Sequence, residues 1–340
     1  MFQKKGNLIS KTLTFGMVAG AMAFAASTTS AQGILKGDTG GVGSVNHTFM
    51  IIMSTVLQKK IGVNLQVNEG QTLTKSALKL GQGKIDVSVV PPVMVPWMHK
   101  GTRFYKKRPG PAKKAVENIR LIMSYGSGVR HYMVWADSGI KTFADLKGKR
   151  VFVGPPRGGA SPVAIAAVKL NSGLVPKKDY KEIRMPWNAG MQAMSDGKLD
   201  AFIRPAGVGA ASMDQLGAKR KFRLLGVNKK KMAKFMNRPD RLYVTIPAGT
   251  YKNQAGNDKD VISDGFRHQL AVRRDMSDDL VYKITKTIFA NLDQMKKSAV
   301  TLKDISLDDP FTGGNIPLHP GAVRFYKEKG KKIPANLAGG

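Results

Sequence analysis

The residues able to carry out acid–base or metal chemistry are few and scattered. No two of the five histidines have the His-x-x-x-His spacing of a metal-binding pair, and the sequence has no cysteine. Asp86 and Asp200 allow one interpretation as paired catalytic carboxylates. The favoured interpretation is that each fixes a helix-to-strand turn through hydrogen bonds to the backbone. The sequence therefore predicts no catalytic group, no metal site and no cofactor. The histidines are His47, His99, His131, His268 and His319.

Two glycine-rich stretches point to binding instead. "GDTGGVGS" (37–44) and "GPPRGGAS" (154–161) each precede a stretch with helical spacing of apolar residues. Backbone N–H groups at a helix start lack partners, and glycine lets them approach an anion closely. A tight connection without a ligand is the competing interpretation of either stretch. The predicted donors are Thr39, Gly40, Gly41, Val42 and Gly43 in the first stretch, and Gly158, Gly159, Ala160 and Ser161 in the second.

Two arginines accompany these loops. Arg204 ends the predicted strand "LDAFIR", and Arg157 lies inside the second glycine stretch. A guanidinium group can hold a carboxylate through two parallel hydrogen bonds. We expect both side chains near one anion-binding cleft, and the alternative for each is a solvated surface arginine.

An internal similarity predicts the elements that position these residues. Glycine loop, helix and a "Gly-Lys-Ile/Leu-Asp" phrase before a strand occur in that order twice, ending at Asp86 and at Asp200. Two α/β lobes of similar design explain this order, although common turn phrases could also match by chance. Strands at 119–126 and 131–136 predict a first crossing between lobes, and 241–251 a return. We expect lobe 1 to contain 32–128 and 249–340, and lobe 2 to contain 129–248.

The N-terminal residues predict export. Lys4, Lys5 and Lys11 precede an apolar run over 13–26, and small residues end at Ala31, which is the layout of a secretory signal peptide over 1–31. A membrane anchor is the less favoured alternative, because the run is short and rich in Gly and Ala. Without cysteine the chain can form no disulfide and carry no lipid on a cysteine. We expect a periplasmic protein that does not insert into the membrane after cleavage.

The formal net charge is +32, and loss of residues 1–31 would remove three lysines and no acid, leaving +29. The lysines are scattered over stretches such as "NKKKMAKF" and "KEKGKK", without the interleaved aromatics of a single-strand nucleic-acid platform. We therefore expect no nucleic-acid partner. A polyanion-binding or surface-adhesive protein remains one alternative function, and an enzyme on the same two-lobe scaffold is another.

Five phrases together suggest a family. "TGGVGS", "SGIKTFADLKGKRVFVGPPRGG", "SDGKLDAFI", "DLVYKITKTIF" and "PLHPGAVRFYKEKG" occur in this order over nearly the whole chain after residue 31. In these phrases the chain resembles the solute-binding subunits of TRAP transporters of the TAXI type. The resemblance implies an α/β, two-lobe periplasmic-binding-protein-like fold (type II), with a hinge and an interlobe cleft. It also implies a small organic-acid ligand such as glutamate, 2-oxoglutarate or another dicarboxylate, delivered to TRAP-type membrane permease subunits for uptake driven by an ion gradient.

Several positions depart from the family pattern. Asn46 and His47 stand where a Tyr-Tyr pair is common, and Gln71 stands where the family has Ser. Thr74 replaces the usual Asn, and Arg157 replaces a glycine. Because these positions lie near the expected cleft, His47 and Gln71 are candidate specificity residues, and Asn46 is a candidate ligand-binding residue.

Overall fold

The computed structural model describes Met1 and residues 33–256 and 258–338. The predicted signal peptide therefore lies, except for Met1, outside the described residues. In the described residues no helix has both the length and the apolar character needed to cross a membrane. The helices are α1 (Val45–Ile61), α2 (Leu73–Gly81), α3 (Met94–Lys100), α4 (Pro109–Glu117), α5 (Ala160–Ser172), α6 (Trp187–Ser195), α7 (Ala211–Gly217), α8 (Lys229–Met236), α9 (Asp278–Ala290), α10 (Leu292–Ser298) and α11 (Pro320–Glu328).

Ten strands of the described chain form one mixed sheet, which confirms the predicted α/β class. Its main path is β2-β1-β3-β10-β4-β7-β5-β6, with β8 paired to β4 and β9 to β10. Pairs within β1–β3 and within β5–β7 are parallel, whereas β10 is antiparallel to both β3 and β4. The strands are β1 (Leu35–Asp38), β2 (Leu65–Asn68), β3 (Val87–Val90), β4 (Ile119–Trp135), β5 (Arg150–Phe152), β6 (Lys181–Ile183), β7 (Ala201–Ala206), β8 (Phe222–Leu224), β9 (Arg241–Ile246) and β10 (Val261–Arg273).

Local sequence explains the best-defined helix ends. The Ser44 hydroxyl accepts a hydrogen bond from the His47 amide and so caps α1, which ends at Gly62 in the left-handed conformation. Ser277 caps α9 in the same way, with Asp278 and Asp279 in the first turn, where the helix dipole favours acids. The helix α9 ends before Asn291, and Lys296 and Lys297 lie in the last turn of the next helix, α10.

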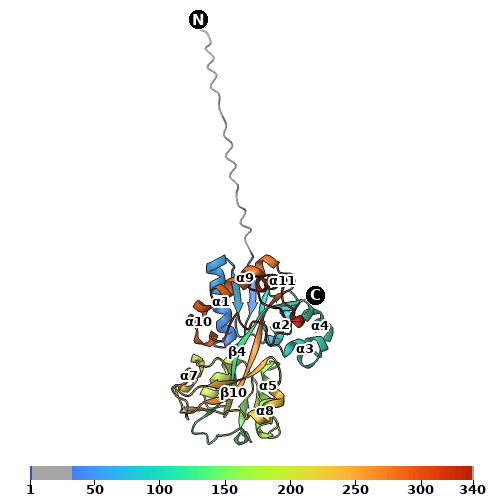
Figure 1. The fold of residues 1–340 in the computed structure, drawn as a ribbon. Helices are drawn as coiled ribbons and strands as arrows, with labels where there is room; N and C mark the ends of the chain where they lie inside the picture. Colours follow the sequence, from blue (N-terminus) through green and yellow to red (C-terminus); the bar gives the residue numbers. More distant parts are fainter. Residues whose placement is uncertain (2–32, 257, 339–340) are drawn as a thin grey trace. The chain divides into compact units, whose positions relative to one another are not determined.

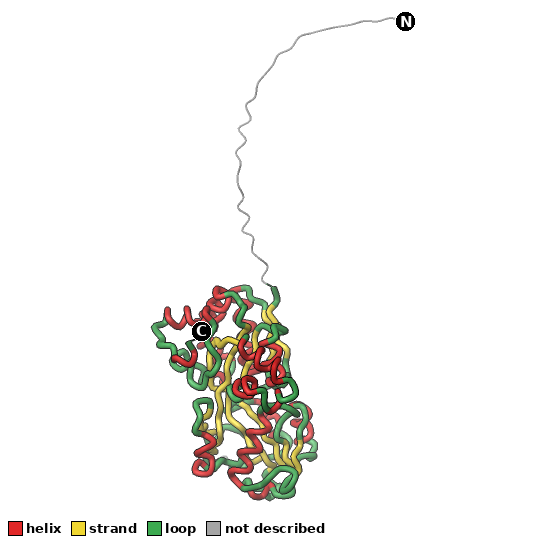
Figure 2. Tube along the Cα trace, turned by 90° about the vertical axis from the view of Figure 1, so that its right-hand side faces the viewer, coloured by secondary structure: helices red, strands yellow, loops and turns green. Residues whose placement is uncertain are grey.

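The buried apolar residues form a first core and a second core. The first core draws on residues 35–125 and 270–337, and the second core, in two clusters, on residues 129–262. The long strands β4 and β10 pass from one core to the other (Figure 1). Figure 2 shows these strands from the side, running between the two groups of helices.

The second crossing lies later in the chain than the sequence predicts. The segment 241–251 does not return to the first core, because β9 pairs with the beginning of β10 and Tyr251 is buried in the second core. Ile262 also packs against the second core. Residues 249–262, which we expected in lobe 1, therefore belong with the second core. The chain crosses back to the first core along β10.

The internal similarity corresponds to a repeated backbone contact. The Asp86 carboxylate accepts from the Lys36 amide at 2.7 Å, and the Asp200 carboxylate accepts from the Arg150 amide at 2.7 Å. Each pair is separated by 50 residues and joins two parallel strands of the sheet. The two carboxylates thus have the structural role that the sequence favoured.

Candidate functional site

A cavity of about 120 Å³ lies between the two cores. In the first part of the chain, its walls come from the loop after β1, the starts of α1 and α2, the segment between β3 and α3, and β4. Further along the chain, they come from the loop before α5, the start of α6, the end of β7, the start of β9 and the middle of β10. An engineered protein cavity of roughly 150 Å³ holds benzene. The present cavity is of a similar order and is partly open to solvent, so it has room for a small organic solute.

The structure brings together eight of the predicted site residues. Gly40, Gly41, Asn46, Gln71, Gly158, Gly159, Ala160 and Arg204 line the cavity. Thr39, Val42, Gly43, His47, Arg157 and Ser161 do not. Residues of both glycine loops therefore line the same cavity.

Close approach of the opposite wall explains two of the glycines. A Cβ atom on Gly41 would lie 2.8 Å from Cδ1 of the Trp187 ring, and one on Gly159 would lie 2.8 Å from the Met94 methyl group. Real Cβ atoms essentially never come that close to another atom. These glycines let side chains of the facing core reach the cavity, a role that we had not predicted beside the expected N–H donation.

In the first loop, the residues outside the lining are used in local contacts. Thr39 is buried, and its amide donates to the carbonyl of Asn68. The Gly43 amide donates to Nδ1 of His47, whose Nε2 lies 3.1 Å from the Glu69 carboxylate. His47 therefore faces Glu69 rather than the cavity.

In the second loop, Arg157 and Ser161 also turn away from the cavity. Arg157 has a left-handed backbone (φ 57°), and its carbonyl accepts from the Thr74 hydroxyl at 2.9 Å. The Ser161 hydroxyl donates to the carbonyl of Pro155 instead of capping α5, which begins at Ala160 after Gly159. The expectation that Arg157 points into the cleft is therefore not met.

Arg204 is a buried cation without an acidic partner. Its residue is 2% exposed, and its guanidinium donates to the Val42 carbonyl at 2.6 Å and contacts the sulfur of Met191 at 3.2 Å. None of the ion pairs formed among the described residues includes Arg204. Burial lowers the pKa of Arg204 to about 10, which still leaves it charged at neutral pH. A buried charge without a counter-ion is costly, so this position favours an anion.

Two further arginines of the lining are already paired with acids. Arg130 forms a buried ion pair with Asp264 and lies over the Phe266 ring, 5.0 Å from its centroid. Arg267 lies 3.0 Å from the Asp309 carboxylate. These acids neutralise their partners. The fourth lining arginine, Arg241, is only partly buried and donates to the Phe235 carbonyl. Among the described lining residues, Arg204 is therefore the fully buried arginine without a carboxylate contact.

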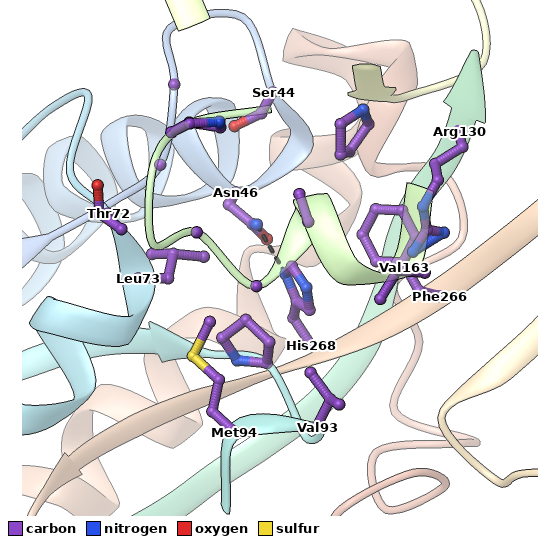
Figure 3. Close-up of a pocket in the computed structure, with 18 of the residues that line it drawn as sticks. Ser44, Asn46, Thr72, Leu73, Val93, Met94, Arg130, Val163, Phe266 and His268 are labelled. Atoms are coloured by element: carbon purple, nitrogen blue, oxygen red, sulfur yellow. Dashed lines mark hydrogen bonds between the residues drawn. The ribbon is translucent and has the colours of Figure 1, made fainter. Parts of the chain in front are cut away.

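The lining also contains a polar network around Asn46. The Asn46 oxygen accepts from the hydroxyls of Tyr125 and Ser127, so its nitrogen donates to Nδ1 of His268 at 2.7 Å (Figure 3). The proton of the His268 ring is therefore on Nε2. Burial, with a smaller effect of Arg130, lowers the pKa of His268 to about 3, so the ring is neutral at physiological pH.

Sequence analysis missed the contributions of β4 and β10 to this lining. Arg130, Phe266, Arg267 and His268 lie on these strands. Nothing in their local pattern distinguishes them from ordinary strand residues. Their place in the fold could have indicated a role, because a strand that crosses between two cores must pass the cavity between them.

The fold and the cavity define a class of protein: an α/β chain with two cores that share two long strands and have a partly open cavity between them. The chain belongs to the NMT1-like family, because the sequence model of that family matches residues 38–330.

The chain is similar to several solved binding proteins at low sequence identity. The chain is similar to the periplasmic aliphatic sulphonate binding protein SsuA of Escherichia coli, with 13% identity, coverage of 90% of this chain and 88% of that one, and a TM-score of 0.47. It is similar to a TRAP periplasmic solute binding protein of Ralstonia eutropha H16 with bound (S)-2-acetolactate, with 13% identity, coverage of 88% and 86%, and a TM-score of 0.45. A third is a TRAP periplasmic solute binding protein of Sulfitobacter with bound β-D-galacturonate, with 12% identity, coverage of 87% and 94%, and a TM-score of 0.46.

Proposed function

We propose that this chain is the solute-binding subunit of a TRAP transporter of the TAXI type. Exported by residues 1–31, it captures a small organic anion in the periplasm and delivers it to TRAP-type membrane permease subunits, which use an ion gradient for uptake. The ligand is a carboxylate such as glutamate, 2-oxoglutarate or another dicarboxylate. The five sequence phrases described above support the TAXI assignment.

Arg204 carries the case for an anion. Its guanidinium lines the cavity, is 2% exposed and contacts no carboxylate among the described residues. A ligand carboxylate would supply the missing counter-charge, and a charge-assisted hydrogen bond contributes about 1.5–3 kcal/mol.

The two long strands suggest how the cavity opens. Gly128 in β4 has φ 113°, and a Cβ there would lie 2.5 Å from the Ala206 carbonyl oxygen. Gly265 in β10 pairs with Val129 and precedes a shift in strand register. Both glycines lie between the two cores, where we place the hinge that closes the two lobes over the solute.

The contacts of the two candidate catalytic carboxylates favour a binding protein over an enzyme. Asp86 and Asp200, the candidates for a catalytic pair, are both engaged with backbone amides and with arginines. Each is fully used in holding two strands together, which supports a receptor over an enzyme on the same scaffold.

The test is a thermal-shift and calorimetric screen in which each acid is paired with its neutral amide. Short hydroxy and keto acids, dicarboxylates, glutamate and alkanesulfonates form the panel. We expect one acid to raise the melting temperature and its amide to leave it unchanged. At 100 times its dissociation constant, the acid should add about 2.7 kcal/mol to the free energy of unfolding. Equal shifts with acid and amide would contradict an anion receptor, and a sulfonate preference would replace the carboxylate assignment.

A further inference from the structure

A second cavity, of about 590 Å³, is strongly cationic, and we name it the basic groove. Four of its cations lie between α3 and α4 and two lie in the second core, after β5 and after β6. No Asp or Glu belongs to its lining. The six cations are Arg103, Lys106, Lys107, Arg108, Arg157 and Arg184.

Most of this charge has no partner within the described chain. Arg184 forms an ion pair with Glu182. None of the ion pairs among the described residues includes any of the other five cations. Because like charges repel, this arrangement destabilises the isolated protein and stabilises a complex with an anion.

Two cations of the groove have a costly backbone conformation. Arg103 (φ 56°) and Arg157 (φ 57°) are in the left-handed region, which is unfavourable for a residue with a side chain. Among the described residues only Lys177 shares this property without being glycine. The two strained arginines lie on opposite walls of the same groove.

Thr74 connects these walls to each other. The Tyr105 hydroxyl donates to the Thr74 carbonyl at 2.9 Å, and the Thr74 hydroxyl donates to the Arg157 carbonyl at 2.9 Å. Thr74 is 4% exposed, and its neighbours Thr72 and Leu73 line the first cavity. The groove is therefore complete only while the two cores are held together next to the first cavity.

From these observations we propose that the basic groove is a docking site for an acidic segment of a protein partner, and that the partner recognises the arrangement in which the two cores are joined through Thr74. This interface goes beyond the proposed capture of a solute and does not depend on which solute is bound.

The shape of the groove favours a peptide over other anions. Five cations without an ion pair in a space of 590 Å³ exceed what one small anion can neutralise. A membrane surface is broad, whereas an extended chain with Asp or Glu side chains can enter a concave groove and approach both walls. Opposite charge at such an interface also accelerates association.

The test measures binding of fluorescein-labelled decaglutamate to the purified protein by fluorescence anisotropy at low and high salt. The groove variant carries Arg103→Glu, Arg108→Glu and Arg157→Glu. The control variant carries Lys219→Glu, Lys230→Glu and Lys234→Glu, which makes the same change in net charge at exposed positions outside the groove. We expect the groove variant to bind at least about tenfold more weakly and the control to stay within about twofold.

Further variants keep the result interpretable. If the groove variant does not fold, Lys106→Gln with Lys107→Gln is compared with Lys230→Gln and Lys234→Gln. Thr74→Val removes the bond to Arg157 without a change of charge, and we expect it to weaken decaglutamate binding about threefold. Equal losses in groove and control variants would overturn the proposal. So would groove-dependent binding of heparin or anionic vesicles without binding of decaglutamate. The solute screen is independent, so failure there leaves this test unaffected.

Discussion

The two glycine loops lie in units of the same strand order, β1–β3 and β5–β7, which we call the first and second halves. They differ in the contacts that their residues make around the cavity. In the β1–β3 unit and in the β5–β7 unit, an aspartate accepts a backbone hydrogen bond from a residue 50 positions earlier. It thereby joins the last strand of the unit, β3 or β7, to the strand before the glycine loop, β1 or β5. The first loop then caps its helix with Ser44, whereas Gly159 begins the second helix without a side-chain cap. The two halves thus share the aspartate contact between parallel strands, whereas the side chains that face the cavity differ.

The halves also differ in how the two aspartates are supported. Asp200 is paired with Arg150, whose amide it also accepts from, so this contact lies within one half. Asp86 is paired with Arg273 of β10, the strand that returns from the second core. The first half is therefore completed by the end of the chain, and the second half is self-contained.

The largest expected effect on the comparison of the two halves comes from substituting Arg204. It belongs to the second half and donates to Val42 of the first. We expect Arg204→Gln to weaken the best ligand of the screen about 30- to 100-fold in calorimetric titration, because a charged hydrogen bond is lost. Arg223→Gln is the matched control, since Arg223 also donates to carbonyls but lies outside the cavity lining. Unchanged affinity in Arg204→Gln would exclude this residue from the site.

The aspartate contacts test the shared frame. We expect Asp86→Ala and Asp200→Ala each to lower the free energy of unfolding by about 2 kcal/mol in urea titrations, because each strands a backbone donor and an arginine. Exposed Asp258→Ala should change it by less than about 0.5 kcal/mol. A loss in one half only would mean that the repeated contact is not equivalent in the two halves.

The acid dependence sharpens this test for one aspartate. The hydrogen bond from Arg150 holds the pKa of Asp200 below its ordinary value. The stability contributed by the ionised carboxylate is thus present above about pH 4, the unfolded value, and lost as the pH falls through the folded one. The difference between wild type and Asp200→Ala should shrink below about pH 4.

The close contacts of Gly41 and Gly159 predict a smaller effect on ligand affinity than the loss of Arg204. Alanine at Gly41 would meet the rigid ring of Trp187, whereas alanine at Gly159 would meet the mobile methyl end of Met94. We expect about a tenfold loss of ligand affinity for Gly41→Ala and about twofold for Gly159→Ala. Gly110→Ala, with open space around its Cβ, controls for the added methyl group. Equal losses at both loops would contradict this distinction between a rigid and a flexible neighbour.

Local sequence patterns predicted the α/β class, the two loops and the position of Arg204, because glycine, helix and strand signals act over a few residues. The same reasoning placed Arg157 in the cleft, and its left-handed backbone turns it into the basic groove instead. His268 and Arg130 were missed because their place depends on β10 pairing with both β3 and β4, a long-range arrangement. The return crossing was placed too early for the same reason.

The shared strands have a consequence for how the molecule unfolds. β4 supplies Leu121 and Tyr125 to the first core and Val129 and Met133 to the second, and β10 is likewise shared. Neither core can lose these strands and keep its own packing. The two cores therefore have one common cooperative transition, although either core is large enough to resemble a separate domain.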